Sequence, residues 1–173
     1  MDLSARCRPI ELLLSDVDGV LTDGGVIFDN EGIEIKRFHI RDGLGIKLWQ
    51  RAGHHFGLVT GRASNIVQLR AVELGVDLVR QGVEDKLPAV KQIMAERGLK
   101  PEQVCYVGDD LPDLPVLQHV GMAIAVGDGS EDLHSAAHYV TKANGGRGAL
   151  REVIEMLLKA QNRWNDLLRK YRG

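Results

Sequence analysis

The stretch 10–20 reads IELLLSDVDGV, and it carries a short apolar run directly into two aspartates, Asp16 and Asp18. Such a run before an Asp-Gly pair predicts a buried strand that ends in a turn. Alternate residues of a strand project to the same side, so Asp16 and Asp18 can face one ligand, and Gly19 lets the backbone turn sharply around it. Two carboxylates at this spacing repel each other unless a cation or a proton relieves the charge. The stretch therefore predicts either an ordinary turn or an acidic site at the end of a strand.

Apolar, strand-like segments alternate with helical patterns along the whole chain. We expect strands at 10–15, 56–60, 78–79, 104–107, 122–126 and 138–140. We expect helices at 44–52, 63–74, 86–97, 112–119, 131–136 and 148–170. This alternation predicts a doubly wound α/β fold, in which helices cover both faces of a parallel sheet. No linker or repeat interrupts it, so residues 1–173 are expected to form a single domain.

One segment departs from this alternation. Residues 25–38 place the turn-rich sequence DNEG, at 29–32, between two apolar runs, which predicts a β-hairpin. The apolar stripe through 148–170 predicts a long C-terminal helix that packs on the body of the protein or on another subunit. Other apolar residues at helical spacing are expected to face the core. They are Leu44, Leu48, Ile66, Leu69, Val72, Val90, Ile93 and Met94.

The composition is that of an ordinary globular domain. Of the 173 residues, 44% are hydrophobic and 27% are charged, and the formal net charge is −2. With both signs intermingled, this charge predicts no basic face for nucleic acid, and no apolar run approaches the ~20 residues of a membrane span. The first residues lack the pattern of a secretory signal, and Cys7 and Cys105 have no metal-ligand spacing. We therefore expect a cytoplasmic protein with reduced thiols, and Cys105 in its core.

Further polar residues occur where other strands are expected to end. Thr60 and Arg62 follow one strand, Lys86 opens a helix, and Asp109 and Asp113 follow a third segment. Each has an ordinary explanation by itself, because a first-turn lysine is usually solvated and an aspartate commonly caps a helix. The carboxyl ends of parallel strands, however, meet at one edge of the sheet. Together with the first acidic pair, these residues supply the nucleophile, the acid, the cation and the metal ligands that phosphoryl transfer requires.

The order of these motifs, DxDGV, VTGR, a later lysine and GDDxxD, resembles the haloacid dehalogenase superfamily. Its phosphatases use an aspartate as nucleophile. The resemblance implies that Asp16 attacks the phosphorus and forms an aspartyl-phosphate. It implies that Asp18 protonates the leaving sugar oxygen and later deprotonates water. Thr60 and Lys86 would hold the phosphoryl oxygens and offset the charge that develops in the transition state.

The same resemblance implies a magnesium site. Asp16, the backbone carbonyl of Asp18 and Asp109 would hold Mg²⁺, with Asp113 reached directly or through water. Such a small ligand set suits Mg²⁺, which keeps several waters. Most members of the superfamily shield the site with a cap domain, but the intervals between these motifs leave no room for one. We therefore expect an open site with only the hairpin as a flap.

Three further stretches, 21–24, 38–46 and 145–152, resemble one capless branch of the superfamily. Its members remove the phosphate from the 8-phosphate of an eight-carbon sugar acid, in the synthesis of lipopolysaccharide precursors. They are homotetramers in which the hairpins meet at the centre and a neighbouring subunit completes each site. The resemblance implies that the substrate contacts are Asp18, His39, Ile40, Arg41, Asp42, Gly43, Lys47, Arg62, Arg70 and Lys86.

Two other functions stay open at this point. A sibling phosphatase acts on a nine-carbon, sialic-type sugar 9-phosphate, but some of its members carry glutamate where this chain has Arg62. A receiver-type phosphoacceptor domain also uses acids, a threonine, a lysine and Mg²⁺, but there the lysine comes last, whereas here Asp109 follows Lys86. The C-terminus departs from the sugar-acid branch, because an apolar stripe continues to Tyr171 in place of a glycine-containing tail.

Overall fold

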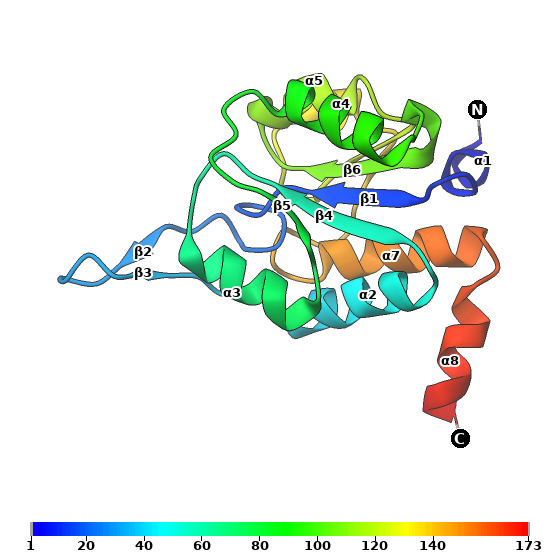
Figure 1. Cartoon of the computed structure of the whole chain (residues 1–173), viewed down its shortest axis with the longest axis horizontal. Helices are drawn as coiled ribbons and strands as arrows, with labels where there is room; N and C mark the ends of the chain where they lie inside the picture. Colours follow the sequence, from blue (N-terminus) through cyan, green and yellow to red (C-terminus); the bar gives the residue numbers. More distant parts are fainter. Residues whose placement is uncertain (1, 173) are drawn as a thin grey trace.

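Six parallel strands form the central sheet, in the order β5-β4-β1-β6-β7-β8 (Figure 1). The computed structural model describes residues 2–172 of the chain. The strands are β1 (Leu12–Ser15), β4 (His55–Val59), β5 (Leu78–Arg80), β6 (Val104–Gly108), β7 (Met122–Ala125) and β8 (Tyr139–Val140). The chain adds β4 and β5 on one side of β1 and then β6, β7 and β8 on the other. This reversal leaves a crevice at the carboxyl ends of the central strands, where open α/β sheets bind their ligands.

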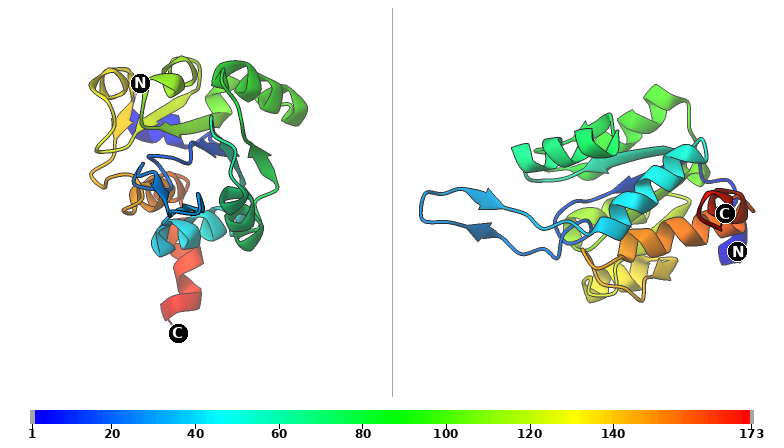
Figure 2. Two further views of the ribbon diagram at one scale, coloured as in Figure 1. Left: turned by 90° about the vertical axis from the view of Figure 1, so that its left-hand side faces the viewer. Right: turned by 90° about the horizontal axis from the view of Figure 1, so that it is seen from below.

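Helices cover both faces of the sheet, as Figures 1 and 2 show. One layer contains α2 (Ile40–Arg51), α3 (Asn65–Leu74) and α7 (Ala149–Ala160), and the other contains α4 (Lys86–Arg97), α5 (Leu114–Leu117) and α6 (Glu131–Ala136). The apolar run of β1 serves both layers, because alternate residues point to opposite faces. Leu13 packs in the core beneath α2 and α7, whereas Leu12 and Leu14 pack in the core beneath α4. The doubly wound fold predicted from the sequence is confirmed.

Helix boundaries differ from the expected ones in several places. A short helix α1 (Leu3–Cys7) was not expected, and the segment expected as a helix at 112–119 is a 3-10 turn, η2 (Leu111–Asp113), followed by α5. Helix α2 begins at Ile40 instead of 44, because the His39 Nδ1 atom accepts a hydrogen bond from the Arg41 amide and caps the helix. The single helix expected at 148–170 was wrong. Asn162 has a left-handed φ of 58°, which ends α7 and sends α8 (Trp164–Arg172) away from the body (Figure 1).

The core stripe expected on α3 was also wrong. Leu69 is 62% exposed and Val72 is 68% exposed. The buried face consists of Val67, Ala71 and Leu74. Both sets follow helical spacing, and the fold buries the one that includes a small alanine. Of the other expected core residues, Leu44 is 37% exposed and Ile66 is half-buried, while Leu48, Val90, Ile93 and Met94 are buried.

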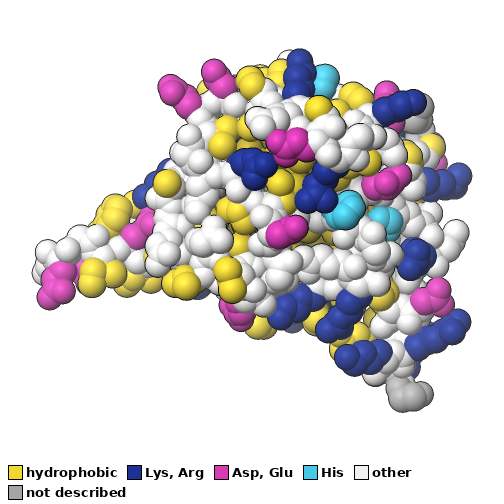
Figure 3. Space-filling view, viewed as in Figure 1, with side chains coloured by type: hydrophobic (Ala, Val, Ile, Leu, Met, Phe, Trp, Pro, Cys, Tyr) yellow, Lys and Arg dark blue, Asp and Glu magenta, His cyan; other side chains and the backbone are white. Residues whose placement is uncertain are grey.

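The predicted hairpin forms and projects from the body (Figures 1 and 2). β2 (Ile27–Phe28) pairs antiparallel with β3 (Glu34–Ile35), and the Asp29 carboxylate accepts hydrogen bonds from two amides of the turn. Its apolar side chains gain little burial within this chain, and yellow side chains line the projection in Figure 3. The exposed apolar residues of the hairpin are Val26, Ile27, Phe28, Ile33 and Ile35.

The cysteines behave as the sequence predicts. Cys7 and Cys105 are both free thiols buried in the core. Burial raises the pKa of Cys7 to about 11 and raises that of Cys105 as well, so both stay protonated at neutral pH. Among residues 2–172, no helix has the length and apolar character needed to cross a membrane.

Candidate active site

The first acidic motif leaves the sheet at the end of β1. Asp16 is buried, and its Oδ1 atom accepts a hydrogen bond from the Val17 amide at 2.6 Å. The turn that follows is held by Thr22, whose hydroxyl oxygen accepts from the amides of Gly19 and Gly24. The local sequence therefore shapes this loop. The Thr22 hydroxyl satisfies two backbone amides that have no partner in a helix or strand.

Glycines let two other loops approach this turn closely. Gly19 has a positive φ of 87°, and a Cβ atom on it would lie 2.0 Å from Asp109 Oδ2. A Cβ atom on Gly145 would lie 1.7 Å from the Gly19 carbonyl oxygen. The Gly146 amide also donates to the Val20 carbonyl at 2.8 Å. The loop before α7 therefore supports the catalytic turn by direct backbone packing.

Three carboxylates meet beneath this turn. Asp16, Asp109 and Asp113 each offer an oxygen within 4.8 Å of the others. They come from the ends of β1 and β6 and from η2, so the sheet reversal brings together residues far apart in the sequence. Asp113 is fully buried, and its Oδ2 atom accepts a hydrogen bond from the Asp109 amide. Hard oxygen ligands clustered in this way suit a divalent cation such as Mg²⁺.

A buried lysine partly balances these charges. The Lys86 ammonium, at the start of α4, donates to Asp16 Oδ2 at 2.6 Å and to Asp113 Oδ1 at 2.7 Å. Burial by itself would lower the pKa of Lys86, but the two carboxylates outweigh that effect and raise it. The lysine is therefore a fixed cation at neutral pH.

Burial and the remaining negative charge raise the pKa values of two of the acids. Burial, with the carboxylates of Asp16 and Asp113 added to it, raises the pKa of Asp109 to about 8. Burial and the nearby Asp113 raise the pKa of Asp16 to about 6, although Lys86 opposes this. Without a further cation the cluster therefore keeps protons at pH values where an aspartate in water would be ionised. A metal ion would take the place of those protons.

Tyr106 also belongs to this site, although its place in an apolar strand gave no chemical signal. Its side chain is fully buried on β6, and its hydroxyl donates to Asp113 Oδ1 at 2.6 Å. Burial and the adjacent carboxylates raise its pKa well above the ordinary value. A buried tyrosine usually requires a partner for its hydroxyl, and that rule is the signal that could have pointed to the acidic cluster.

Five of the predicted site residues surround one open cavity of about 570 Å³. They come from β1 and its loop, from the end of β4 and from the start of α4, as expected for the carboxyl edge of the sheet. Thr60 is buried where β4 ends, and Arg62 is partly exposed at the rim. The residues that line the cavity are Asp16, Asp18, Thr60, Gly61, Arg62, Gly82, Val83, Glu84, Lys86 and Pro112.

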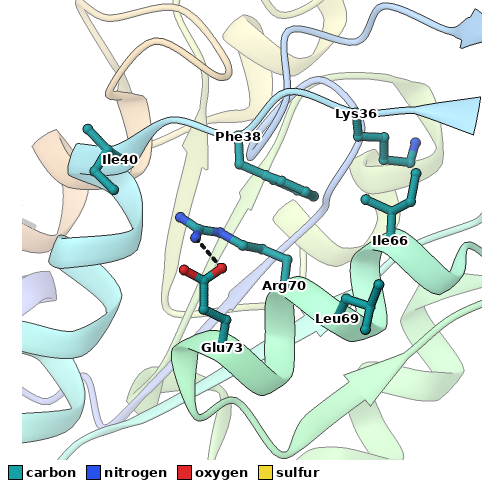
Figure 4. Close-up of a pocket in the computed structure, with 7 residues that line it drawn as sticks. All are labelled: Lys36, Phe38, Ile40, Ile66, Leu69, Arg70 and Glu73. Atoms are coloured by element: carbon teal, nitrogen blue, oxygen red, sulfur yellow. Dashed lines mark hydrogen bonds and ion pairs between the residues drawn. The ribbon is translucent and has the colours of Figure 1, made fainter.

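The other predicted substrate residues lie elsewhere on the same chain. Ile40 and Arg70 line a second cavity of about 350 Å³, where Arg70 pairs with Glu73 and lies over the Phe38 ring (Figure 4). Ile40, Gly43, Lys47 and Arg70 also line a cavity of about 270 Å³ between α2 and α3. His39 and Arg41 flank Ile40 at the start of α2. One chain therefore does not bring this group, which we call the α2–α3 face, to the acidic cavity.

Asp42 has a structural role within this chain. It was expected to contact substrate, but it is only 2% exposed. Its Oδ1 atom accepts from the Arg151 amide at 2.7 Å and its Oδ2 atom from the Gly148 amide at 3.2 Å. Both oxygens therefore satisfy amides at the start of α7, and the carboxylate ties α2 to α7. The sequence could not show this, because the partner amides are more than a hundred residues away.

Known proteins match this chain in sequence and in fold. The family model for haloacid dehalogenase-like hydrolases matches residues 73–154. The 3-deoxy-D-manno-octulosonate 8-phosphate phosphatase of Yersinia pestis is 43% identical over 162 residues, which cover 94% of this chain and 87% of that protein.

Solved structures give the same result. The 3-deoxy-D-manno-octulosonate 8-phosphate phosphatase of Moraxella catarrhalis, in complex with a magnesium ion, a phosphate ion and a KDO molecule, matches with a TM-score of 0.96 and 38% identity, covering 98% of this chain and 97% of that one. A probable yrbi family phosphatase from Pseudomonas syringae matches with a TM-score of 0.97 and 43% identity, covering 99% and 97%.

The parallel sheet, the paired aspartates at the end of β1 and the lysine on α4 define a phosphatase of the haloacid dehalogenase-like hydrolases. Within residues 2–172 the sheet carries the β2–β3 hairpin and no cap domain. More closely, the chain belongs to the family of 3-deoxy-D-manno-octulosonate 8-phosphate phosphatases, which are phosphoric monoester hydrolases.

Proposed function

We propose that this protein hydrolyses 3-deoxy-D-manno-octulosonate 8-phosphate to the free sugar acid and phosphate, with Mg²⁺ as cofactor. The observation that carries the proposal is the cavity in which Asp16, Asp18, Thr60 and Lys86 meet, in a chain so similar to phosphatases of that substrate. We include in the proposal a cytoplasmic role in making lipopolysaccharide precursors.

The reaction would proceed in two steps on the side chains of this cavity. An Asp16 carboxylate oxygen attacks the phosphorus, the ester bond to the sugar breaks, and Asp18 gives its proton to the departing sugar oxygen. Asp18 then takes a proton from water, and that water attacks the aspartyl-phosphate and releases inorganic phosphate. The ammonium of Lys86, 2.6 Å from Asp16, and the hydroxyl of Thr60 are placed to hold phosphoryl oxygens.

The acidic cluster supports the magnesium requirement. Asp16, Asp109 and Asp113 would hold Mg²⁺, with the backbone carbonyl of Asp18. The donor set fits, because all of these groups are hard oxygens, and burial together with the neighbouring carboxylates raises the pKa of Asp109 to about 8. When bound, the ion would neutralise charge on the phosphoryl group and orient it toward Asp16.

The proposal includes a homotetramer. The apolar residues of the hairpin are exposed in the structure of residues 2–172, which suits burial against other subunits. The α2–α3 face carries Arg41, Lys47 and Arg70 outside the acidic cavity, so we assign these cations to the substrate carboxylate in a neighbouring subunit's site, with Arg70 held by Glu73. Arg62, at the rim of the cavity itself, favours an eight-carbon acid over the nine-carbon alternative.

The first test measures phosphate release with Mg²⁺ from three substrates: 3-deoxy-D-manno-octulosonate 8-phosphate, a sialic-type sugar 9-phosphate and simple hexose phosphates. We expect strong preference for the first and no release in EDTA. Asp16→Asn should remove turnover and leave the fold intact, because it deletes the nucleophile and preserves shape. Preference for the 9-phosphate, or an active Asp16→Asn protein, would contradict the proposal.

The assembly is tested separately by light scattering. We expect a tetramer, and a polar substitution such as Phe28→Ser on the hairpin should weaken it. A monomer that retained full activity would show that no neighbouring subunit contributes to the site.

A further inference from the structure

The segment that returns from the hairpin to α2 crosses beside the acidic cavity and buries a lysine there. The Lys36 side chain is only 1% exposed, and its ammonium donates to Asp18 Oδ1 at 2.5 Å. Its stem lines the cavity shown in Figure 4, while the ammonium extends away from the Arg70 guanidinium. Lysine is almost never buried without a partner, because ordering and desolvating it are costly. The partner here is the proposed acid of the reaction.

Glu34 is a second carboxylate beside this lysine. Its Oε1 atom lies 3.2 Å from the Lys36 ammonium and 2.7 Å from Arg62 Nη2. Its Oε2 atom accepts a hydrogen bond from the Ser64 hydroxyl at 2.8 Å. Glu34 thus joins the base of the hairpin to the loop after β4 and places a second negative charge beside the ammonium.

The two oxygens of Asp18 are left in different surroundings. Oδ1 accepts the hydrogen bond from Lys36, whereas Arg62 Nη1 lies 3.8 Å from Oδ2, beyond hydrogen-bond distance. Asp18 lines the cavity in which the phosphate ester would bind. An anchored carboxylate presents one oxygen in a fixed direction, and proton transfer needs that precision of placement.

We propose that Lys36 is a positioning residue for the reaction: it anchors Asp18 through Oδ1 and leaves Oδ2 to give and take the proton, and Glu34 holds Lys36 in place. The inference rests on the proposed two-step phosphatase mechanism, and it adds residues that the sequence analysis did not single out. The hairpin then serves catalysis within its own chain, in addition to any contact with other subunits.

The test compares leaving groups. The sugar alkoxide of the substrate needs a proton as it departs, whereas the nitrophenolate of p-nitrophenyl phosphate departs without one. The ratio kcat/KM reports phosphoryl transfer to Asp16 and is insensitive to the later hydrolysis. General acid catalysis contributes about 10²–10⁴-fold, and a misplaced acid forfeits part of that. We expect Lys36→Met to lower kcat/KM for the sugar phosphate about 10- to 100-fold, through kcat, and to change that for p-nitrophenyl phosphate by less than about threefold.

Matched variants separate this role from a structural one. Lys36→Arg keeps a donor and should restore part of the activity, and Glu34→Gln should give a smaller loss in the same direction. Arg37→Met is the control, because Arg37 is the adjacent cation and pairs with Asp23 instead. It should match wild type. Thermal unfolding and light scattering establish that each variant is folded and assembled.

The outcomes decide the inference. An equal fall for both substrates would overturn it, because the lysine would then act on the phosphoryl group or on the fold. No fall for either would overturn it as well. A wrong substrate assignment would give a different result from a wrong role for Lys36. In that case wild-type protein would release phosphate from hexose phosphates but not from the sugar acid phosphate. The comparison of hexose phosphate with p-nitrophenyl phosphate would then still test Lys36.

Discussion

Replacing Lys86 with methionine removes the only ammonium that contacts the acidic cluster among the described residues. Methionine keeps the length and apolar stem of the side chain, so packing changes little. The lysine is 3% exposed and bonds both Asp16 and Asp113, which classes it as a buried ion pair. Breaking such a pair from one side costs about 3–5 kcal/mol, because it leaves buried charge uncompensated. We expect that loss in the free energy of unfolding at pH 8 without metal.

The loss should depend on pH and on metal. The pKa of Asp16 is raised to about 6 and that of Asp109 to about 8, so at pH 5.5 protons already neutralise much of the cluster. Lys86→Met should therefore cost less at pH 5.5 than at pH 8. Mg²⁺ should recover part of the loss at pH 8, since it supplies positive charge at the same place.

Urea unfolding followed by circular dichroism, in EDTA and in Mg²⁺ at both pH values, measures these free energies. Lys91→Met is the matched control, because Lys91 is an exposed lysine of the same helix. It should change stability by less than about 0.5 kcal/mol. A loss for Lys86→Met that is the same at both pH values and unaffected by Mg²⁺ would refute the argument, because packing and not charge would then explain it.

Three further predictions address the metal site and its support. Tyr106→Phe removes the hydroxyl that orients Asp113 and should weaken Mg²⁺ binding about tenfold in calorimetric titration; unchanged affinity would contradict this role. Gly145→Ala places a methyl group 1.7 Å from the Gly19 carbonyl oxygen, so we expect about 1–3 kcal/mol of destabilisation and a fall in kcat, and wild-type behaviour would contradict the packing described. Because the folded-state pKa of Asp109, about 8, exceeds the ordinary 3.8, the metal-free fold should lose stability as pH rises from about 4 to about 8. The gain in Tm from Mg²⁺ should then be larger at pH 8 than at pH 5.5 in scanning calorimetry, and equal gains would count against the linkage.

Sequence patterns predicted the strands of the sheet well, because a strand buried on both faces leaves a short apolar run in the sequence. The run before Asp16 is apolar on both faces, and strands of this kind are buried by helices from both sides. Helix faces were harder to predict. On α3 two apolar sets, one with Leu69 and one with Ala71, both have helical spacing, and only contact with the sheet selects between them. The break at Asn162 was also invisible, because neither glycine nor proline marks it.

Local patterns in the chain were enough to predict the chemistry we propose: two aspartates after an apolar strand, a threonine, a lysine and a later acidic loop, in an order that fits phosphoryl transfer. They were enough because strand periodicity and the identity of reactive side chains can both be read from short segments. The folded structure was needed to show which polar residues are neighbours. In it, Tyr106 contacts Asp113 and Lys36 contacts Asp18. The Asp42 carboxylate accepts a hydrogen bond from an amide of helix α7. Such pairings depend on distances between segments far apart in sequence, and no local pattern records them.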